Sequence, residues 1–261
     1  MSTSLQQSIR IQSRVIGALL MREIITRYGR HNIGFLWLFL EPMIFTLGIT
    51  ALWNALKEVH GNNLSITAFA VTGYSSILLW RNCSNRMVKA LEVNQSLLYH
   101  SNVRVIDVFT ARLLLEIAGA SASLIVLTCI LSATGWMSFP SDLLVAVEGW
   151  LLLAWFSFAL GLLVGAISEL SEVMERIWHI ITYMMFPLSG AAYLVDWLPP
   201  RLQQLALWVP MVHSTEMMRQ GYFGAAIHTH AQPLYLLTVN LVLTLVGLAA
   251  VVDVSKRVEP E

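Results

Sequence analysis

Long apolar runs separated by short polar segments dominate the pattern of this chain. A helix of roughly 20 apolar residues crosses the hydrocarbon core of a membrane, which is about 30 Å thick. Runs long enough for this occupy six ranges: 33–53, 66–86, 108–131, 143–167, 177–195 and 233–252. The second run is the least regular, because its apolar part ends at Trp80 and a polar segment, 81–86, follows. The pattern predicts an all-α integral membrane protein with six transmembrane helices within residues 33–252.

Residues 1–32 precede the first run and have a different pattern. Their apolar and basic side chains fall on opposite faces of a helix: Leu5, Ile9, Ile16 and Leu20 on one, Arg10 and Arg14 on the other. Such an amphipathic helix is suited to the cytoplasmic membrane surface, and packing against another subunit explains the pattern equally well. Glu23 and Arg27 are spaced to pair across one helical turn.

Residues 196–232, between the fifth and sixth runs, contain shorter apolar pieces. Pieces of about ten to fourteen residues are too short to span a membrane but suit re-entrant or interfacial helices. Pro199, Pro200 and Pro210 predict where these pieces begin or end. We expect short external re-entrant helices in this region.

The distribution of Lys and Arg predicts the orientation of the chain. Six spans place both termini on one side, and the cytoplasmic side carries the excess of basic residues. Thirteen of the 16 basic residues fall on the side of the termini, and only Lys57, Arg201 and Arg219 on the other. We therefore expect both termini, including the tail 253–261, and the loop 87–107 to be cytoplasmic. Apolar residues within this loop favour a short surface helix that docks to a partner over a solvated linker.

Composition agrees with a membrane protein: 56% of residues are hydrophobic and 12% are charged, whereas soluble domains carry about 25% charged residues. Acidic and basic residues balance at 16 each, so no nucleic-acid partner is expected. The N-terminus has no apolar segment behind a basic start, so we expect no cleaved signal peptide. Cys83 and Cys129 lie at separate apolar runs and are expected to be unpaired.

Catalytic and metal chemistry find little support in the sequence. No lysine follows a glycine, so the chain lacks a P-loop and any ATP hydrolysis belongs to a partner. His228 and His230 have no third ligand nearby in sequence, so no metal site is predicted. Ser189 and His213 resemble the serine and histidine of intramembrane proteases, but the glycine-containing sequence before the serine is missing. No catalytic residue is therefore predicted.

Glu41 and Pro42 interrupt the first apolar run. The leucine, isoleucine and phenylalanine residues of this run favour insertion by roughly 5 kcal/mol, and a central acidic group costs about 2.5 to 3.5 kcal/mol. The run therefore inserts, but a charge at this depth normally faces protein or water. Pro42 also removes a backbone hydrogen bond to Leu38, which favours a kink. Two interpretations stay open: Glu41 is a static strut between helices, or the kink is the hinge of a gate.

Three segments carry a more specific arrangement of residues. They are LLMREIITRYGRHNIGFLWLFLEPMIF (19–45), LEVNQSLLYHSNVRVIDVFTARLLLE (91–116) and LPPRLQQLALWVPMVHSTEMMRQGYFG (198–224). The chain resembles the inner-membrane permease of ABC-2 type polysaccharide exporters, most closely the capsular polysaccharide (KpsM-type) branch. The resemblance extends over nearly the whole chain and in the same order.

The resemblance implies a homodimer of six-span subunits with the ABC-2 (type V exporter) fold, bound to two separate ATPase subunits that hold ATP and Mg²⁺. This chain itself would bind no cofactor and would be no enzyme. Its substrate would be a lipid-linked capsular polysaccharide, exported across the bacterial inner membrane. A periplasmic co-polymerase or adaptor and an outer-membrane export protein would complete the assembly.

The matching positions carry over as expected roles. An N-terminal gating helix (1–32) would include Arg22, Glu23 and Arg27, and a hinge at the pore entrance would include Trp37, Glu41 and Pro42. Glu92, Asn94 and Gln95 would couple to the ATPase. The external re-entrant region would include Pro210, His213, Glu216 and Arg219. Because sugar faces stack on aromatic rings, the candidates for the glycan path are Tyr28, Trp37, Phe39 and Tyr74, although each of these rings also suits core packing or interface anchoring.

Other functions remain alternatives at this stage. O-antigen and teichoic acid exporters share the architecture that the resemblance implies. A membrane enzyme of glycan or lipid metabolism would use Ser189, His213 or Glu41 and would work without ATP. An ion-coupled transporter would use Glu41 as its proton site, although the sequence has neither an inverted-repeat signal nor several intramembrane carboxylates.

Overall fold

The computed structural model describes residues 5–28, 32–56, 64–94, 98 and 103–258, and every regular element in these ranges is helical. Long helices overlap all six predicted runs: α2 (Asn32–Leu56), α3 (Ile66–Met87), α5 (Val105–Ala133), α6 (Leu143–Leu170), α7 (Glu172–Leu188) and α10 (Pro233–Val258). Of these, α5, α6 and α10 are long and apolar enough to cross a membrane by length and composition alone. The chain is therefore an all-helical protein with membrane-spanning character.

Capping residues explain where several helices begin. The Ser65 side chain accepts a hydrogen bond from the Ala68 backbone NH at the start of α3. The Asp142 carboxylate accepts from two backbone NH groups in the first turn of α6. These oxygens satisfy backbone donors that a helix leaves without an internal partner.

The fifth long helix differs from its prediction. The apolar run extends over 177–195, but α7 begins at Glu172 and ends at Leu188. Gly190 follows with a φ of +78°, a backbone conformation that favours glycine and ends the helix. The last residue of the run, Val195, begins a separate one-turn helix, η2 (Val195–Trp197).

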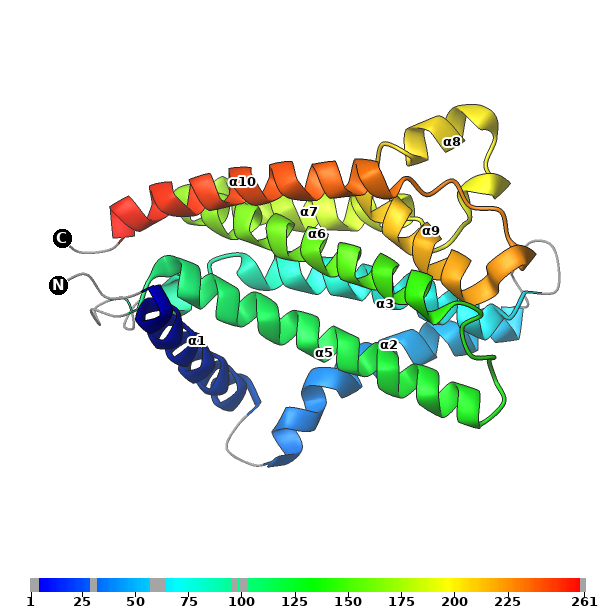
Figure 1. The fold of residues 1–261 in the computed structure, drawn as a ribbon, viewed down its shortest axis with the longest axis horizontal. Helices are drawn as coiled ribbons and strands as arrows, with labels where there is room; N and C mark the ends of the chain where they lie inside the picture. The colour runs from blue at the N-terminus through cyan, green and yellow to red at the C-terminus, as the bar shows by residue number, and fades with distance from the viewer. Residues whose placement is uncertain (1–4, 29–31, 57–63, 95–97, 99–102, 259–261) are drawn as a thin grey trace.

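The long helices run side by side along the molecule, and both termini lie at the same end (Figure 1). At that end, α1 (Leu5–Tyr28) packs against α5 and α2. Central in the bundle is α6, which packs against α3, α10 and α9 (Pro210–Phe223). Large buried side chains such as Trp80, Phe109 and Leu153 form the main core between these helices.

Two short helices, α8 (Pro200–Ala206) and α9, occupy the region that the prolines predicted, and Pro200 and Pro210 stand in their first turns. They lie at the end of the molecule opposite the termini (Figure 1). Residues 211–219 of α9 are all buried, so this helix is enclosed by α3, α6 and α10 instead of lying on the surface. Close backbone contact makes this possible: a Cβ on Gly149 of α6 would lie 2.8 Å from the Met218 backbone nitrogen.

In the second half of α1, the apolar face packs against the bundle. Leu19 is buried, and Ile16 and Leu20 pack against the main core. Ile9, predicted on the same face, is 60% exposed.

Candidate functional site

Five charged residues from α1, α2, α3 and α5 form a connected network where these helices meet. Glu41 Oε2 is 3.8 Å from Arg86 Nη2, and Arg86 Nε is 3.9 Å from Glu116 Oε1. Arg112, one turn before Glu116, donates through Nε to Glu23 Oε1 at 2.8 Å and through Nη1 to the Arg86 carbonyl at 3.3 Å. These contacts connect the predicted gating helix to the Glu41-Pro42 segment through α5 and α3.

Two ion pairs of this network differ in burial, and this difference separates a fixed pair from one that breaks easily. The Arg112 and Glu23 side chains are 10% and 8% exposed, and leaving either charge without its partner would cost several kcal/mol, about 3 to 5. The Arg86 and Glu41 side chains are 46% and 52% exposed, and such a pair contributes only about 0 to 1 kcal/mol. The Glu23–Arg112 pair therefore holds α1 on α5, whereas the Glu41–Arg86 pair separates at little cost.

The Glu41–Arg86 pair lines a polar cavity of about 390 Å³ between α2, α3 and α7. The other lining residues are Pro42, Phe45, Leu78, Arg81, Asn82, Asn85 and His179. The polar segment 81–86 thus shares this cavity with Glu41. The Asn85 side-chain oxygen is buried and has no hydrogen-bond partner within the part of the chain that the structure describes, so it is available to a ligand or water.

Pro42 is buried inside α2, and the helix continues through it. Figure 1 shows that α2 is bent between its first turns and the part that runs beside α3. A proline within a helix is the usual cause of such a bend, because it removes one backbone hydrogen bond. The cavity with Glu41 therefore adjoins the deformable part of α2.

The predicted gating helix touches the predicted coupling segment directly. Arg22 Nη1 on α1 donates to Asn94 Oδ1 at 2.7 Å, and Asn94 is buried and also donates to the Ala90 carbonyl. Asn94 closes the one-turn helix η1 (Glu92–Asn94), whose Glu92 side chain is 61% exposed. Gln95, the third predicted coupling residue, lies outside the described residues. Asn94 thus faces α1, while Glu92 faces outward.

The turn between α3 and η1 is held on the junction of α6 and α7. The Leu91 backbone NH donates to Glu169 Oε1 at 2.8 Å, and the Lys89 NH donates to Ser168 Oγ at 3.2 Å. Lys89 Nζ is 2.9 Å from a Glu175 oxygen, and this contact raises the pKa of Lys89. A force applied to this turn would therefore reach α1, α6 and α7 together.

Among the aromatic candidates for a glycan path, the structure describes the side chains of Tyr74 and Trp37. Tyr74 on α3 is buried and packs against the rings of Phe45, Trp53 and Phe186, with centroid distances of 6.2, 5.4 and 5.9 Å. Its role in this structure is core packing. Phe45 connects that cluster to the cavity at Glu41.

Trp37 on α2 is 52% exposed and is therefore free to meet a ligand or another surface. The side chains of Arg27, Tyr28 and Phe39, which the sequence also singled out, lie outside the described part of the structure.

At the opposite end, Arg219 is completely buried in α9. Its guanidinium donates to the Gly190 and Tyr193 carbonyls at 2.6 Å each and to the Ala191 carbonyl. The same group lies 3.6 Å from the centroid of the Phe69 ring, a cation–π contact. Arg219 therefore fastens the chain after α7 onto α9.

Glu216, one turn earlier on α9, joins two other segments. Its carboxylate accepts from the Val195 NH at 3.2 Å and from the His230 NH at 3.1 Å. This brings Asp196 beside His228 and His230, so the structure supplies the third potential ligand that is absent from the nearby sequence. The two segments are distant in sequence, and no local spacing could reveal this cluster.

Ser189 and His213 do not form a nucleophile and base pair. Ser189 Oγ donates to the Phe186 carbonyl at 2.7 Å. His213 uses both ring nitrogens on backbone groups: Nε2 contacts the Leu207 carbonyl at 2.9 Å, and Nδ1 accepts from the Gln232 NH at 3.1 Å. Both side chains hold local structure, which gives no support to a hydrolytic centre at these residues.

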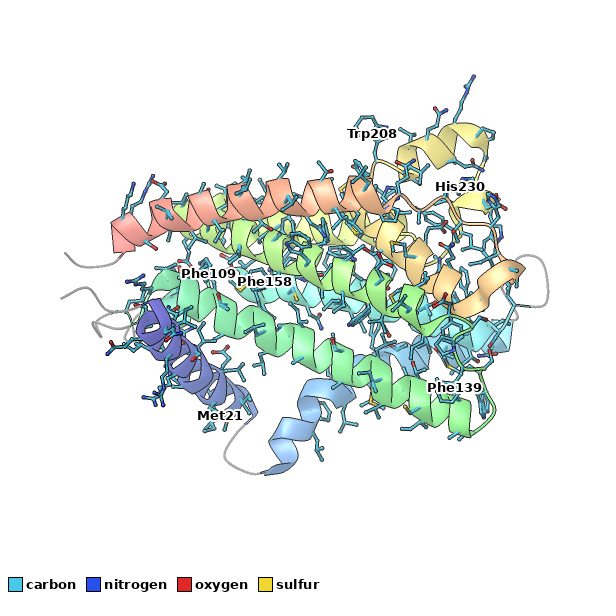
Figure 2. All side chains as sticks on the ribbon, in the orientation of Figure 1. Met21, Phe109, Phe139, Phe158, Trp208 and His230 are labelled. Atoms are coloured by element: carbon cyan, nitrogen blue, oxygen red, sulfur yellow. The ribbon has the colours of Figure 1, made fainter. Side chains whose placement is uncertain are left out.

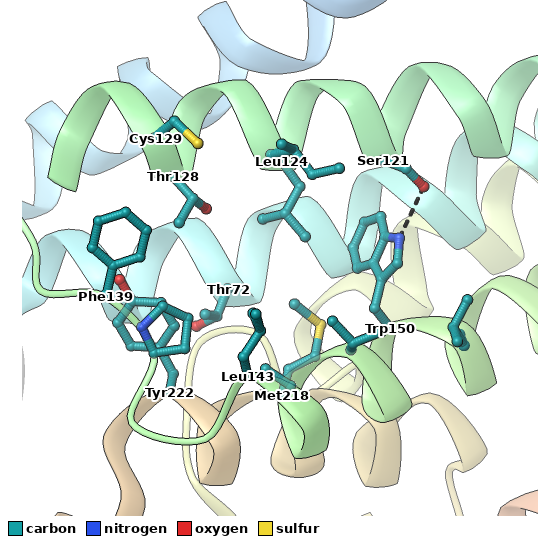
Figure 3. A pocket seen from close by; sticks show the side chains of 15 residues that line it. Thr72, Ser121, Leu124, Thr128, Cys129, Phe139, Leu143, Trp150, Met218 and Tyr222 are labelled. Carbon is teal, nitrogen blue, oxygen red and sulfur yellow. Dashed lines mark hydrogen bonds between the residues drawn. The ribbon is translucent and has the colours of Figure 1, made fainter. Parts of the chain in front are cut away.

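An apolar cavity of about 430 Å³ lies between α3, α5, α6 and α9. Figure 3 shows Trp150 donating to Ser121 along one wall, and the ring of Phe139 at the other end. Among the residues that the structure describes, none that lines this cavity has a charged side chain. This cavity suits hydrocarbon, whereas the cavity at Glu41 suits polar groups.

Comparison with known proteins gives one family match and several relatives that are similar over nearly the whole chain. The sequence profile of the ABC-2 type transporter family matches residues 14–223. The chain is 51% identical to the capsule polysaccharide export inner-membrane protein CtrC of Neisseria meningitidis serogroup B, over 99% of this chain and 98% of the relative. It is 46% identical to BexB of Haemophilus influenzae, also named a capsule polysaccharide export inner-membrane protein, over the same shares. The polysialic acid transport protein KpsM of Escherichia coli is 28% identical over 92% of this chain and 93% of the relative. On the family match and on these nearly full-length similarities, the chain belongs to the ABC-2 type transporter family.

Proposed function

We propose that this chain is the transmembrane permease subunit of an ATP-binding cassette transporter that exports lipid-linked capsular polysaccharide across the bacterial inner membrane. The observation that carries this function is the nearly full-length similarity to CtrC and BexB, whose names state capsule polysaccharide export. We further propose that the chain has six spans with both termini cytoplasmic. It works as a homodimer bound to two ATPase subunits that supply ATP and Mg²⁺.

The contacts at the end of the molecule where both termini lie support a route that transmits movement of the ATPase to the helices. The ATPase docks on the segment 87–107 and meets the exposed Glu92. Movement of this segment pulls α1 through the hydrogen bond between Arg22 and Asn94. Because Glu23 and Arg112 stay paired, α1 and α5 move together.

This movement opens the polar cavity by separating Glu41 from Arg86, the exposed ion pair of the network. The bend at Pro42 lets the first turns of α2 swing away, so Glu41 acts at a hinge. Arg81, Asn82 and Arg86 then offer hydrogen-bond donors to the entering substrate. The exposed Trp37 adds a surface on which a sugar ring stacks.

Transport beyond the inner membrane requires further proteins. We propose that the end with α8 and α9 faces the periplasm, where it meets a co-polymerase or adaptor that leads to an outer-membrane export protein. O-antigen and teichoic acid export remain the alternatives within the same architecture, and the capsule is favoured because the names of CtrC and BexB specify it.

Uptake by inverted inner-membrane vesicles tests this function. Vesicles that contain the chain and its ATPase should take up lipid-linked capsular polymer only when ATP is present. Vesicles with an ATPase variant that binds but does not hydrolyse ATP serve as the control. ATP-independent uptake, or uptake driven by a proton gradient alone, would contradict the proposal.

A further inference from the structure

A cluster of metal-binding side chains lies at the end of the molecule opposite the termini, outside the network at Glu41. Asp196 belongs to η2, and His228 and His230 lie in the segment that leads into α10. One potential ligand atom from each of the three residues lies within 4.8 Å of the other two. Figure 2 labels His230, which lies beside η2 at this end of the ribbon. We propose that Asp196, His228 and His230 bind a divalent transition-metal ion, with Zn²⁺ as the ion of best fit.

The distances agree with the size of a zinc site. Tetrahedral zinc has bonds of about 2.0 to 2.1 Å to histidine nitrogen, which places neighbouring ligand atoms roughly 3.3 Å apart. Asp196 Oδ1 is 3.2 Å from His230 Nε2 and 3.8 Å from His228 Nδ1. The two imidazole rings are 5.0 Å apart between centroids. The separation of 3.8 Å at His228 is somewhat longer than the spacing of ligand atoms around zinc, and the side chain is mostly exposed, so it has freedom to rotate.

The backbone around these ligands is fixed by a buried carboxylate. Glu216 is almost completely buried in α9 and accepts from the backbone NH of Val195, the residue before Asp196. Its second oxygen accepts from the backbone NH of His230 itself. One carboxylate therefore holds both ligand-bearing segments in place. Such outer support is what orients the ligands of natural metal sites.

A second contact fixes the residue between the two histidines. Thr229 Oγ1 donates to Gln220 Oε1 on α9 at 3.2 Å. With the backbone held on both sides, the side chains of His228 and His230 both turn towards Asp196. The cluster thus rests on a rigid helix and not on the loop alone.

The ligand set determines the class of ion. Imidazole nitrogen binds zinc, copper and nickel well, whereas Mg²⁺ and Ca²⁺ require more oxygen ligands than one aspartate supplies. Two histidines and one carboxylate leave the fourth position of tetrahedral zinc open to water or to an oxygen of an external ligand. The bound ion would join the chain after α7 to the chain before α10 and would brace the end of α9.

Zinc binding by the purified full-length chain tests this site, independently of any transport activity. The protein is reconstituted in lipid nanodiscs, carries an affinity tag without histidines and is stripped of metal with a chelator. Titration with ZnCl₂ in a calorimeter should show one saturable site per chain. MgCl₂ in excess should not compete.

The ligand variants are His228→Ala and His230→Ala. Both keep the backbone groups that Glu216 and the neighbouring chain use, so the fold should be retained. Each should weaken zinc binding at least tenfold, because each removes one protein ligand of the ion. The controls are His179→Ala and Asp253→Asn, an exposed histidine and an exposed carboxylate elsewhere, which should bind zinc as the unmodified chain does.

Spectroscopy of Co²⁺ in place of zinc gives a second readout. The unmodified chain should show the visible absorption bands of four-coordinate cobalt, and His230→Ala should lose them. Absence of saturable zinc binding in the unmodified chain would overturn the proposal. A loss smaller than tenfold in either histidine variant would overturn it too, leaving only hydrogen bonds and ion pairs among the three side chains.

Discussion

At the scale of single residues, two ion pairs of similar chemistry differ in their surroundings. Glu23 and Arg112 are buried between α1 and α5, whereas Glu41 and Arg86 are about half exposed at a polar cavity. A buried charge without its partner is strongly destabilising, and an exposed one is not. We therefore assign the Glu23–Arg112 pair to the stability of the fold and the Glu41–Arg86 pair to the transport cycle.

Glu23→Gln should lower the free energy of unfolding by about 3 kcal/mol, because the neutral amide no longer balances the charge of the buried Arg112. Glu41→Gln, the matched change at the exposed pair, should lower it by less than about 1 kcal/mol. Thermal unfolding of both variants in the same nanodiscs compares them. Equal losses would contradict the division into a fixed and a breakable pair.

Glu41→Ala should reduce polysaccharide export at least tenfold while membrane insertion and protein level stay unchanged, because the apolar residues of α2 suffice for insertion. The reversal Glu41→Arg with Arg86→Glu should recover part of the export that Glu41→Arg alone loses. Both predictions are tested by measuring surface polysaccharide relative to the amount of inserted protein. Normal export with Glu41→Ala would remove Glu41 from the mechanism.

At the scale of elements, the segment after α3 has an inner and an outer side. Asn94 faces inward to Arg22 on α1, and Glu92 is exposed. Docking of an ATPase depends on the outer side, whereas transmission of its movement depends on the inner side.

Glu92→Arg should therefore reduce co-purification of the ATPase, with Asp253→Arg as the control at an exposed carboxylate on α10. Asn94→Ala should keep the ATPase bound but uncouple ATP hydrolysis from export, so that more ATP is consumed for each polymer exported. Loss of the ATPase from the Asn94 variant, with retention in the Glu92 variant, would reverse the two assignments.

Close packing of α6 and α9 also belongs to this scale. A Cβ at Gly149 would lie 2.8 Å from the Met218 backbone nitrogen, whereas a Cβ at Gly48 on α2 would meet nothing within 4 Å. Gly149→Ala should therefore lower the melting temperature by several degrees, because the helices must move apart. Gly48→Ala should leave it unchanged or raise it, since alanine favours the helix. A stable Gly149 variant would contradict the packing of α9 inside the bundle.

Particular elements show what the sequence could and could not reveal. The positions of α5, α6 and α10 follow from run length, because a span must cover a fixed apolar thickness, and α2 and α3 overlap the first two apolar runs. Pro200 and Pro210 marked the starts of α8 and α9 through their backbone chemistry. The burial of α9 was not predictable, because it depends on which helices enclose it.

The charge network required the three-dimensional structure for the same reason. Arg112 and Glu116 lie one turn apart in α5, but their partners come from α1 and α3. Glu23 pairs with Arg112 because α5 covers the helix face that carries Glu23, and the expected partner Arg27 has its side chain outside the described part of the structure. Asp196 is distant in sequence from His228 and His230, and only the fold brings the three residues together.

At the scale of the whole molecule, the two ends have different tasks in this account. The end with the termini carries the coupling segment, α1 and the breakable ion pair. The other end holds α8, α9 and the three-residue cluster, fastened by Arg219 and Glu216. The α3 and α6 helices connect them, because each contributes to both ends. This arrangement fits a permease that receives its power stroke on one side of the membrane and releases its substrate on the other.

The location of finished polymer in a deletion strain distinguishes export from biosynthesis. A strain that lacks this gene should accumulate complete, lipid-linked capsular polysaccharide in the cytoplasm and have none on its surface. Expression of the unmodified chain from a plasmid should restore the surface polymer. Absent or truncated polymer in the deletion strain would place the chain in biosynthesis and would contradict the account.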